Sequence, residues 1–251
     1  MTDIKLQSIF NRVKDSEFIQ DNPAYKNTAE KIKIKLIDSN IVNAYATTLE
    51  SGSHVIAVNK GLCYFCDAIG IALALGGKEI LKSLMMEYTS IILSKKGKFR
   101  DDDLEECIES IEPKPTEFIF KEATSYSDAC LFAILGHELG HICLSHTIHG
   151  ENSYNDSISR NNERSADLFT SSVVMSSPFG KYIITGNLLF LIGFTWITNS
   201  LDCEHAATSH PYSRERAEYT FNSHEQDLIA YGITRESFDA MMPPYACKSE
   251  K

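Results

Sequence analysis

The chain has 251 residues, of which 43% are hydrophobic and 23% are charged, and its formal net charge is −10. This composition is that of a folded protein and argues against a disordered or fibrous chain. The acidic balance argues against general nucleic-acid binding and against docking on an anionic membrane, because both depend on basic patches.

The cysteines and the first residues indicate a reducing compartment. The seven cysteines are odd in number, and their spacings do not form a disulfide framework. Cys63 and Cys66 have CxxC spacing, but no second such pair completes a four-thiolate zinc site, so both are predicted to pack in the core. The first residues carry scattered charges and lack the apolar region of a signal peptide. We therefore expect a cytoplasmic protein, with membrane association as the alternative.

The first part of the chain predicts a helix followed by a small sheet. Residues 2–22 carry apolar side chains near helical spacing. Residues 31–37 alternate strictly between lysine and apolar residues, which is typical of a half-buried strand. Short β-type runs at 43–48 and 54–58 flank the polar residues 50–53, and this pattern predicts a hairpin.

Helices are predicted for most of the chain after the hairpin. Residues 62–93 are apolar with helical character. Residues 94–117 are basic, then acidic, then rich in proline, and they predict an exposed, partly helical insertion. Ser127 and Asp128 are predicted to cap a helix that runs from Ala129 to about Ser145.

An uncharged run from Tyr182 to Leu201 lies between two further predicted helices, which begin near Asn161 and Ser213. The run is just long enough to span a bilayer. It contains several threonines and asparagines, however, and no cluster of Lys or Arg flanks it. We therefore predict a buried core helix, and a membrane-spanning segment is the alternative.

The residues from His137 to His141 read His-Glu-Leu-Gly-His and match the HExxH motif on a helix. Residues four apart lie one above the other on a helix face, so His137 and His141 can hold one metal ion. Glu138 lies about 100° further round the helix, where its carboxylate can reach a water molecule on that metal. Zinc lowers the pKa of such a water, and Glu138 would take its proton and deliver it to the leaving amine.

A catalytic zinc site needs a third protein ligand from another element. Glu163 comes after enough chain for a loop and a returning helix, and Asp167 lies on the same helix face. We expect Glu163 to bind the zinc and Asp167 to accept a hydrogen bond from a ligand histidine. The alternative is a surface helix with charged residues four apart. His146 and His149 are predicted to lie on the surface.

The motif at 137–141, followed by Glu163-Arg-Ser-Ala-Asp167, resembles the M48 family of zinc metallopeptidases, which contains the CAAX-prenyl protease and the HtpX-type quality-control proteases. The resemblance runs from about residue 31 to residue 220, in the order of the family's segments. It implies zinc on His137, His141 and Glu163 and a general base at Glu138.

Two further stretches carry the resemblance. Asn43, Ala44 and Tyr45 resemble the family's Asn-Ala-Phe segment, whose edge strand pairs with an extended substrate. That similarity assigns these three residues to the substrate edge strand.

The second stretch is His210-Pro, which resembles the family's His-Pro … Arg segment. It implies that His210 stabilises the oxyanion of the transition state. Either Arg214 or Arg216 corresponds to the family's arginine, and the sequence leaves both as candidates.

These observations predict an α+β protein of the zincin (gluzincin) type, mainly helical, with a small sheet beside the active-site helix. We expect a single domain over residues 1–251 with its core at about 31–220. The predicted function is a zinc endopeptidase with one zinc ion per chain and a protein or peptide substrate. The alternatives are a non-catalytic or regulatory zincin-fold module, and a phage-exclusion protease of the Lit type. Glu138 favours an enzyme, because a structural zinc site has no use for an acid between two histidine ligands.

Overall fold

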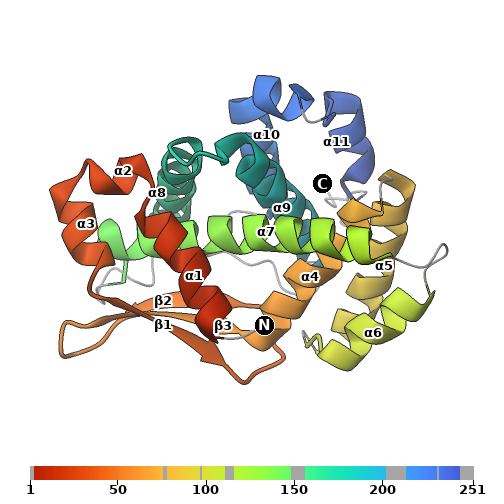
Figure 1. Ribbon diagram of the computed structural model, residues 1–251, viewed down its shortest axis with the longest axis horizontal. Helices are drawn as coiled ribbons and strands as arrows, with labels where there is room; N and C mark the ends of the chain where they lie inside the picture. Colours follow the sequence, from red (N-terminus) through yellow and green to blue (C-terminus); the bar gives the residue numbers. More distant parts are fainter. Residues whose placement is uncertain are drawn as a thin grey trace.

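The computed structural model describes residues 3–75, 78–96, 98–110, 116–147, 156–201, 213–230 and 232–243. The helices and strands are, in chain order, α1 (Asp3–Lys14), α2 (Glu17–Gln20), α3 (Pro23–Ala29), β1 (Ile32–Ile37), β2 (Ala44–Thr48), β3 (His54–Asn59), α4 (Lys60–Ala74), α5 (Lys78–Ser94), α6 (Asp101–Ser110), α7 (Glu117–Cys143), α8 (Asp156–Met175), α9 (Gly180–Leu201), α10 (Ser213–Ala230) and α11 (Arg235–Met241). Within these ranges the protein is mainly helical with one small sheet, which confirms the α+β prediction (Figure 1).

β3 is the central strand of the sheet. β1 lies parallel to it on one side, and β2 lies antiparallel to it on the other. β1 is the predicted alternating strand: Ile32 is buried, whereas Lys33 and Lys35 are exposed. β2 and β3 form the predicted hairpin, and β2 is left as an edge strand that contacts α7.

Helix α7 runs through the middle of the molecule, with the sheet on one side and α8, α9 and α10 on the other (Figure 1). Every residue from Ala129 to Gly136 is buried, because apolar side chains surround this part of the helix on all sides. A helix that is apolar all round needs neighbours on every face. α4, α8, α9, α1 and the sheet are those neighbours, and they hold the HExxH segment inside the protein.

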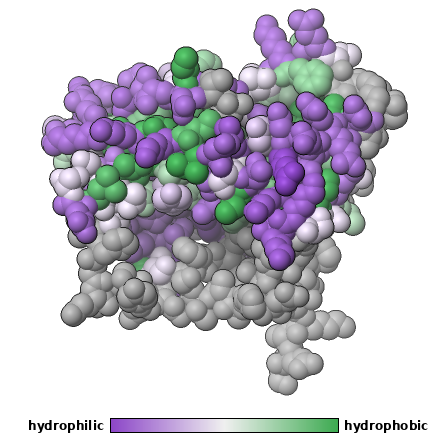
Figure 2. All heavy atoms as spheres, turned by 90° about the horizontal axis from the view of Figure 1, so that it is seen from below, coloured by the Kyte–Doolittle hydropathy of each residue, from purple (hydrophilic) through white to green (hydrophobic). Residues whose placement is uncertain are grey.

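The uncharged run that begins at Tyr182 forms α9, and Ile183, Ile184 and Leu188 are fully buried. The prediction of a core helix is confirmed for the side chains that are described. Among the described residues, no helix combines the length and apolarity needed to cross a bilayer. Seen from below, the described surface is mostly hydrophilic, and its hydrophobic residues form small groups (Figure 2).

Several predicted helix boundaries are wrong. The helix predicted over 2–22 is divided, because Ser16 is extended and separates α1 from α2. α7 begins at Glu117, where the side chain of Thr116 accepts from the N–H of Ile119. Ser127 lies inside the helix, where its hydroxyl donates to Asp67 of α4. α8 begins at Asp156, ahead of the predicted start near 161.

The segment predicted as an exposed insertion, 94–117, is partly buried where it is described. Helix α6 is amphipathic and buries Leu104 and Cys107 against the core, because these residues are three apart on one helix face. Asp103 is also buried, and it forms an ion pair with Lys95. The acidic composition of the segment led to the prediction of exposure, although one face of the helix is apolar.

Gly70 allows α4 to pack closely on α7. A β-carbon there would lie 2.3 Å from the carbonyl oxygen of Ala123. We expect Gly70→Ala to lower the free energy of unfolding by about 1–3 kcal/mol, because the backbone has to move. Gly136→Ala is the matched control, because its nearest contact is 3.6 Å away and alanine favours helix by up to about 1 kcal/mol. Urea unfolding measures both, and a Gly70→Ala protein as stable as the parent would contradict the expectation.

Candidate metal centre

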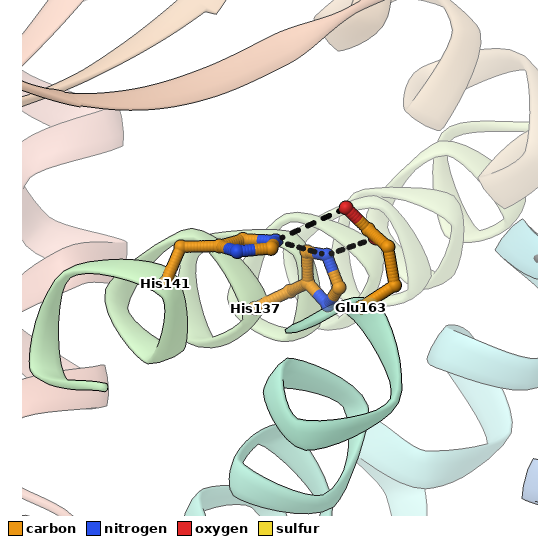
Figure 3. Close-up of side chains that lie close together, drawn as sticks. All are labelled: His137, His141 and Glu163. Atoms are coloured by element: carbon orange, nitrogen blue, oxygen red, sulfur yellow. Dashed lines mark hydrogen bonds and ion pairs between the residues drawn. The ribbon is translucent and has the colours of Figure 1, made fainter. Parts of the chain in front are cut away.

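The candidate metal centre lies where α8 packs against α7. His137 and His141 project from one face of α7 toward Glu163 of α8 (Figure 3). Gly140, inside the motif, faces α8: a β-carbon there would lie 3.3 Å from the Cα of Ala166. The glycine therefore lets α8 approach closely enough for Glu163 to reach the histidines.

Three side chains converge in this centre, the two histidines through Nε2 and Glu163 through its two carboxylate oxygens. His137 Nε2 lies 3.2 Å from Glu163 Oε2. His141 Nε2 lies 3.1 Å from His137 Nε2 and 3.4 Å from Glu163 Oε1. Ligands about 2.0–2.1 Å from a tetrahedral zinc ion are about 3.3 Å apart, so the separation of the two histidine nitrogens is close to an edge of such a tetrahedron, and each nitrogen lies at a similar distance from one oxygen of Glu163. The residues present therefore fit a zinc ion.

The second ring nitrogen of His137 faces a carboxylate. His137 Nδ1 lies 3.0 Å from Asp167 Oδ1, so the neutral ring would carry its proton on Nδ1 and offer the lone pair of Nε2 to a metal. Burial and Arg216 lower the pKa of His137, but its hydrogen bonds to Asp167 and Glu163 outweigh them and raise it to about 9. The two carboxylates therefore make this a site that favours a positive charge.

Arg216 of α10 joins the centre by a bidentate ion pair. Its Nε donates to Asp167 Oδ2 at 2.9 Å, and its Nη2 donates to Asp167 Oδ1 at 2.8 Å. Burial would raise the pKa of Asp167, but Arg216 and His137 together lower it to about 2. Arg214 points elsewhere and donates to the carbonyl oxygen of Pro243 at 2.7 Å. Of the two arginines left open by the sequence, the structure places Arg216 beside the metal centre.

The family model of peptidase family M48 matches residues 4–154, which is more than half of the chain. The chain belongs to peptidase family M48. Members of this family have a zincin-like fold, in agreement with the predicted fold class. No curated protein and no solved structure matches the chain. The matched residues include the HExxH helix but end before Glu163, so the family match does not cover the predicted third ligand, which the structure places beside the two histidines.

Glu138 connects the M48 motif to the sheet. Its carboxylate accepts a hydrogen bond from the backbone N–H of Ala46 in β2. Burial, the largest cause, raises the pKa of the Glu138 carboxyl, and nearby Glu163 raises it as well. A base whose pKa lies closer to neutrality is better suited to take and return a proton.

The register of the hairpin decides which residues face the open edge of β2. Asn59 N–H donates to the carbonyl oxygen of Asn43 at 3.1 Å. Because such bonds alternate along an antiparallel pair, Asn43 and Tyr45 turn their backbone groups toward β3. The backbone groups at the open edge belong to the even-numbered residues Ala44, Ala46 and Thr48. Of the three residues predicted for the edge strand, only Ala44 has its backbone groups there.

His146 was predicted to lie on the surface, and that prediction is wrong. It is half-buried, and its Nδ1 lies 3.2 Å from Nδ1 of His141. Burial lowers the pKa of His146, and burial and His137 lower the pKa of His141 to about 3, so both rings are neutral. The spacing gave no signal of this contact, because residues five apart do not share a face of a continuous helix.

A cavity of about 500 Å³ lies between α8 and α10. Asp167 and Arg216 line it, together with the more exposed side chains of Leu168 and Tyr219. The ion pair therefore forms a wall shared by the cavity and the metal centre. His210, predicted as an oxyanion stabiliser, lies outside the described residues.

Proposed function

We propose that this M48 protein is a zinc-dependent endopeptidase. His137, His141 and Glu163 would hold one zinc ion, and Glu138 would act as the general base. The observation that carries the proposal is the convergence of the side chains of His137, His141 and Glu163 on two packed helices, with 3.1–3.4 Å between the facing nitrogen and oxygen atoms of each pair. When bound, zinc supplies a Lewis acid that lowers the pKa of a water molecule and polarises a carbonyl group.

The residues around the donors prepare them for this role. Asp167 holds the Nδ1–H of His137, which keeps Nε2 available. Arg216 balances the charge of Asp167 and lies 3.8 Å from Glu163. Neither carboxylate is therefore buried without a partner, which would be costly.

Glu138 is the residue that would move protons. The N–H of Ala46 fixes its carboxylate at the edge of the sheet, next to His137. There Glu138 would take the proton of the attacking water and later deliver it to the leaving amine. A site whose role is only structural has no use for a carboxylate so placed.

A peptidase acts on protein or peptide substrates, and the edge strand supports an extended one. The backbone groups of Ala44, Ala46 and Thr48 face away from β3, and apart from the Ala46 N–H, which donates to Glu138, they could pair with a substrate segment as a further strand. Asn43 and Tyr45 would contribute through their side chains, which are exposed. The oxyanion role of His210 and the single-domain organisation remain predictions of the sequence.

The experiment is a zinc analysis combined with proteolysis of an unfolded protein. We expect about one zinc per chain, internal cleavage of the substrate, loss of cleavage with a chelator and recovery when zinc is restored. Sequencing the fragment N-termini distinguishes an endopeptidase from an enzyme that trims chain ends. Bound zinc without cleavage of any protein or peptide would favour the non-catalytic module, and a protein that binds no zinc would remove the proposal.

A further inference from the structure

The C-terminal turn of α7 carries His146 back over the metal centre. Ser145 has a positive φ of 62°, so the chain reverses directly after the helix. The N–H of His146 donates to the carbonyl oxygen of His141 at 2.8 Å, and the N–H of Ser145 donates to that of Ile142 at 3.0 Å. This pair of bonds is a Schellman motif, and it places residue 146 against the last turn of the helix.

The two imidazole rings meet through one specific pair of atoms. His141 Nδ1 and His146 Nδ1 are 3.2 Å apart, and the ring centroids are 5.2 Å apart with an angle of 70° between the planes. The Nε2 atom of His141 faces the opposite way, toward His137 and Glu163. A metal ion on Nε2 requires the proton of His141 to be on Nδ1. That Nδ1–H then points at His146, whose Nδ1 is the acceptor within reach.

We propose that His146 is a positioning residue for the metal centre: it accepts the Nδ1–H of His141 and so fixes the tautomer and orientation of that ligand. The inference rests on the proposed zinc site. Asp167 has the same relation to His137, at 3.0 Å. Each ligand histidine would then have its own acceptor, and the one at His146 adds no further negative charge to a centre that already contains three carboxylates.

The turn that carries His146 is held from its far side as well. Thr147 is buried, and its hydroxyl lies 2.5 Å from that of Thr48, at the end of the edge strand. Thr48 in turn lies 2.9 Å from Nδ1 of His54. These contacts anchor Thr147, the residue that follows His146, between the helix and the sheet.

Two substitutions separate the hydrogen bond from ring packing. His146→Phe keeps an aromatic ring against His141 but removes the acceptor. His146→Asn removes most of the ring but can place an amide oxygen close to the position of Nδ1. Zinc affinity is measured by competition with a chromophoric chelator, and the electronic spectrum of the Co²⁺-substituted protein reports the ligand geometry. We expect His146→Phe to weaken zinc binding by about 10–100-fold and to alter the Co²⁺ spectrum, and His146→Asn to restore most of both.

The thermal midpoint of each metal-free variant serves as the control for folding. If His146→Phe binds zinc as tightly as the parent protein, or if Phe binds more tightly than Asn, the inference is wrong while the zinc site stands. If the parent protein itself binds no zinc, both the inference and the proposed function are wrong. Should His146→Phe not fold, His146→Ala takes its place, and equal zinc affinity of the Ala and Asn variants would overturn the inference.

Discussion

Glu138→Gln should leave the protein folded and loaded with zinc while slowing peptide hydrolysis by at least about 100-fold, the usual effect of losing a general base. Glutamine keeps the shape of the side chain, and its amide oxygen can still accept from the N–H of Ala46. It cannot take a proton from water. The loss should therefore appear in kcat and leave the metal content unchanged.

Glu117→Gln is the matched control for this experiment. Glu117 lies on the same helix, but it is exposed and stands in the first turn, far along α7 from the motif. The control should retain full activity. If Glu138→Gln were as active as Glu117→Gln, Glu138 would not be the general base, and the proposed hydrolytic mechanism would have to be abandoned.

Removing any of the three proposed ligands should have the largest effect on metal binding. His137→Ala, His141→Ala and Glu163→Ala each leave two donors of the three, so zinc affinity should fall by more than the ~10–100-fold typical of losing an outer partner. Proteolytic activity should fall with the zinc content. Metal analysis after gel filtration measures the first effect, and cleavage of an unfolded protein measures the second.

Two further variants calibrate that series. Asp167→Asn should fall between the ligand variants and the parent, because it weakens the hold on His137 without removing a donor. Glu225→Ala, at an exposed position of α10, should bind zinc normally. Full zinc occupancy in all three ligand variants would show that the metal, if there is one, binds elsewhere.

The spacing of residues close together in the sequence was sufficient to predict the centre of the site. His137 and His141 share a helix face because they are four residues apart, and this geometry holds wherever the helix is placed. The alternation of lysine with apolar residues likewise identified β1, because a strand exposes every second side chain. Glu163 was predicted by its type and its distance along the chain, and the structure brings it within 3.4 Å of both histidines.

The segment with His210 shows where such reasoning stops. Its proposed role rests on resemblance to the M48 family, since a histidine before a proline has no periodic partner that would locate it. It lies outside the described residues, so the role of His210 remains a prediction.

Other features of the site could not be predicted from the sequence, because they depend on contacts between elements that are distant in the chain. Arg214 and Arg216 are two residues apart on one helix, so the packing of α10 alone selects Arg216 to meet Asp167. The residues at the open edge of β2 are determined by the hairpin register, because a shift of one residue would exchange the two sets. His146 reaches His141 only because the helix ends and reverses at Ser145. Periodicity describes regular elements, whereas the place where an element stops, and the neighbour it then meets, are decided by the packing of the whole chain.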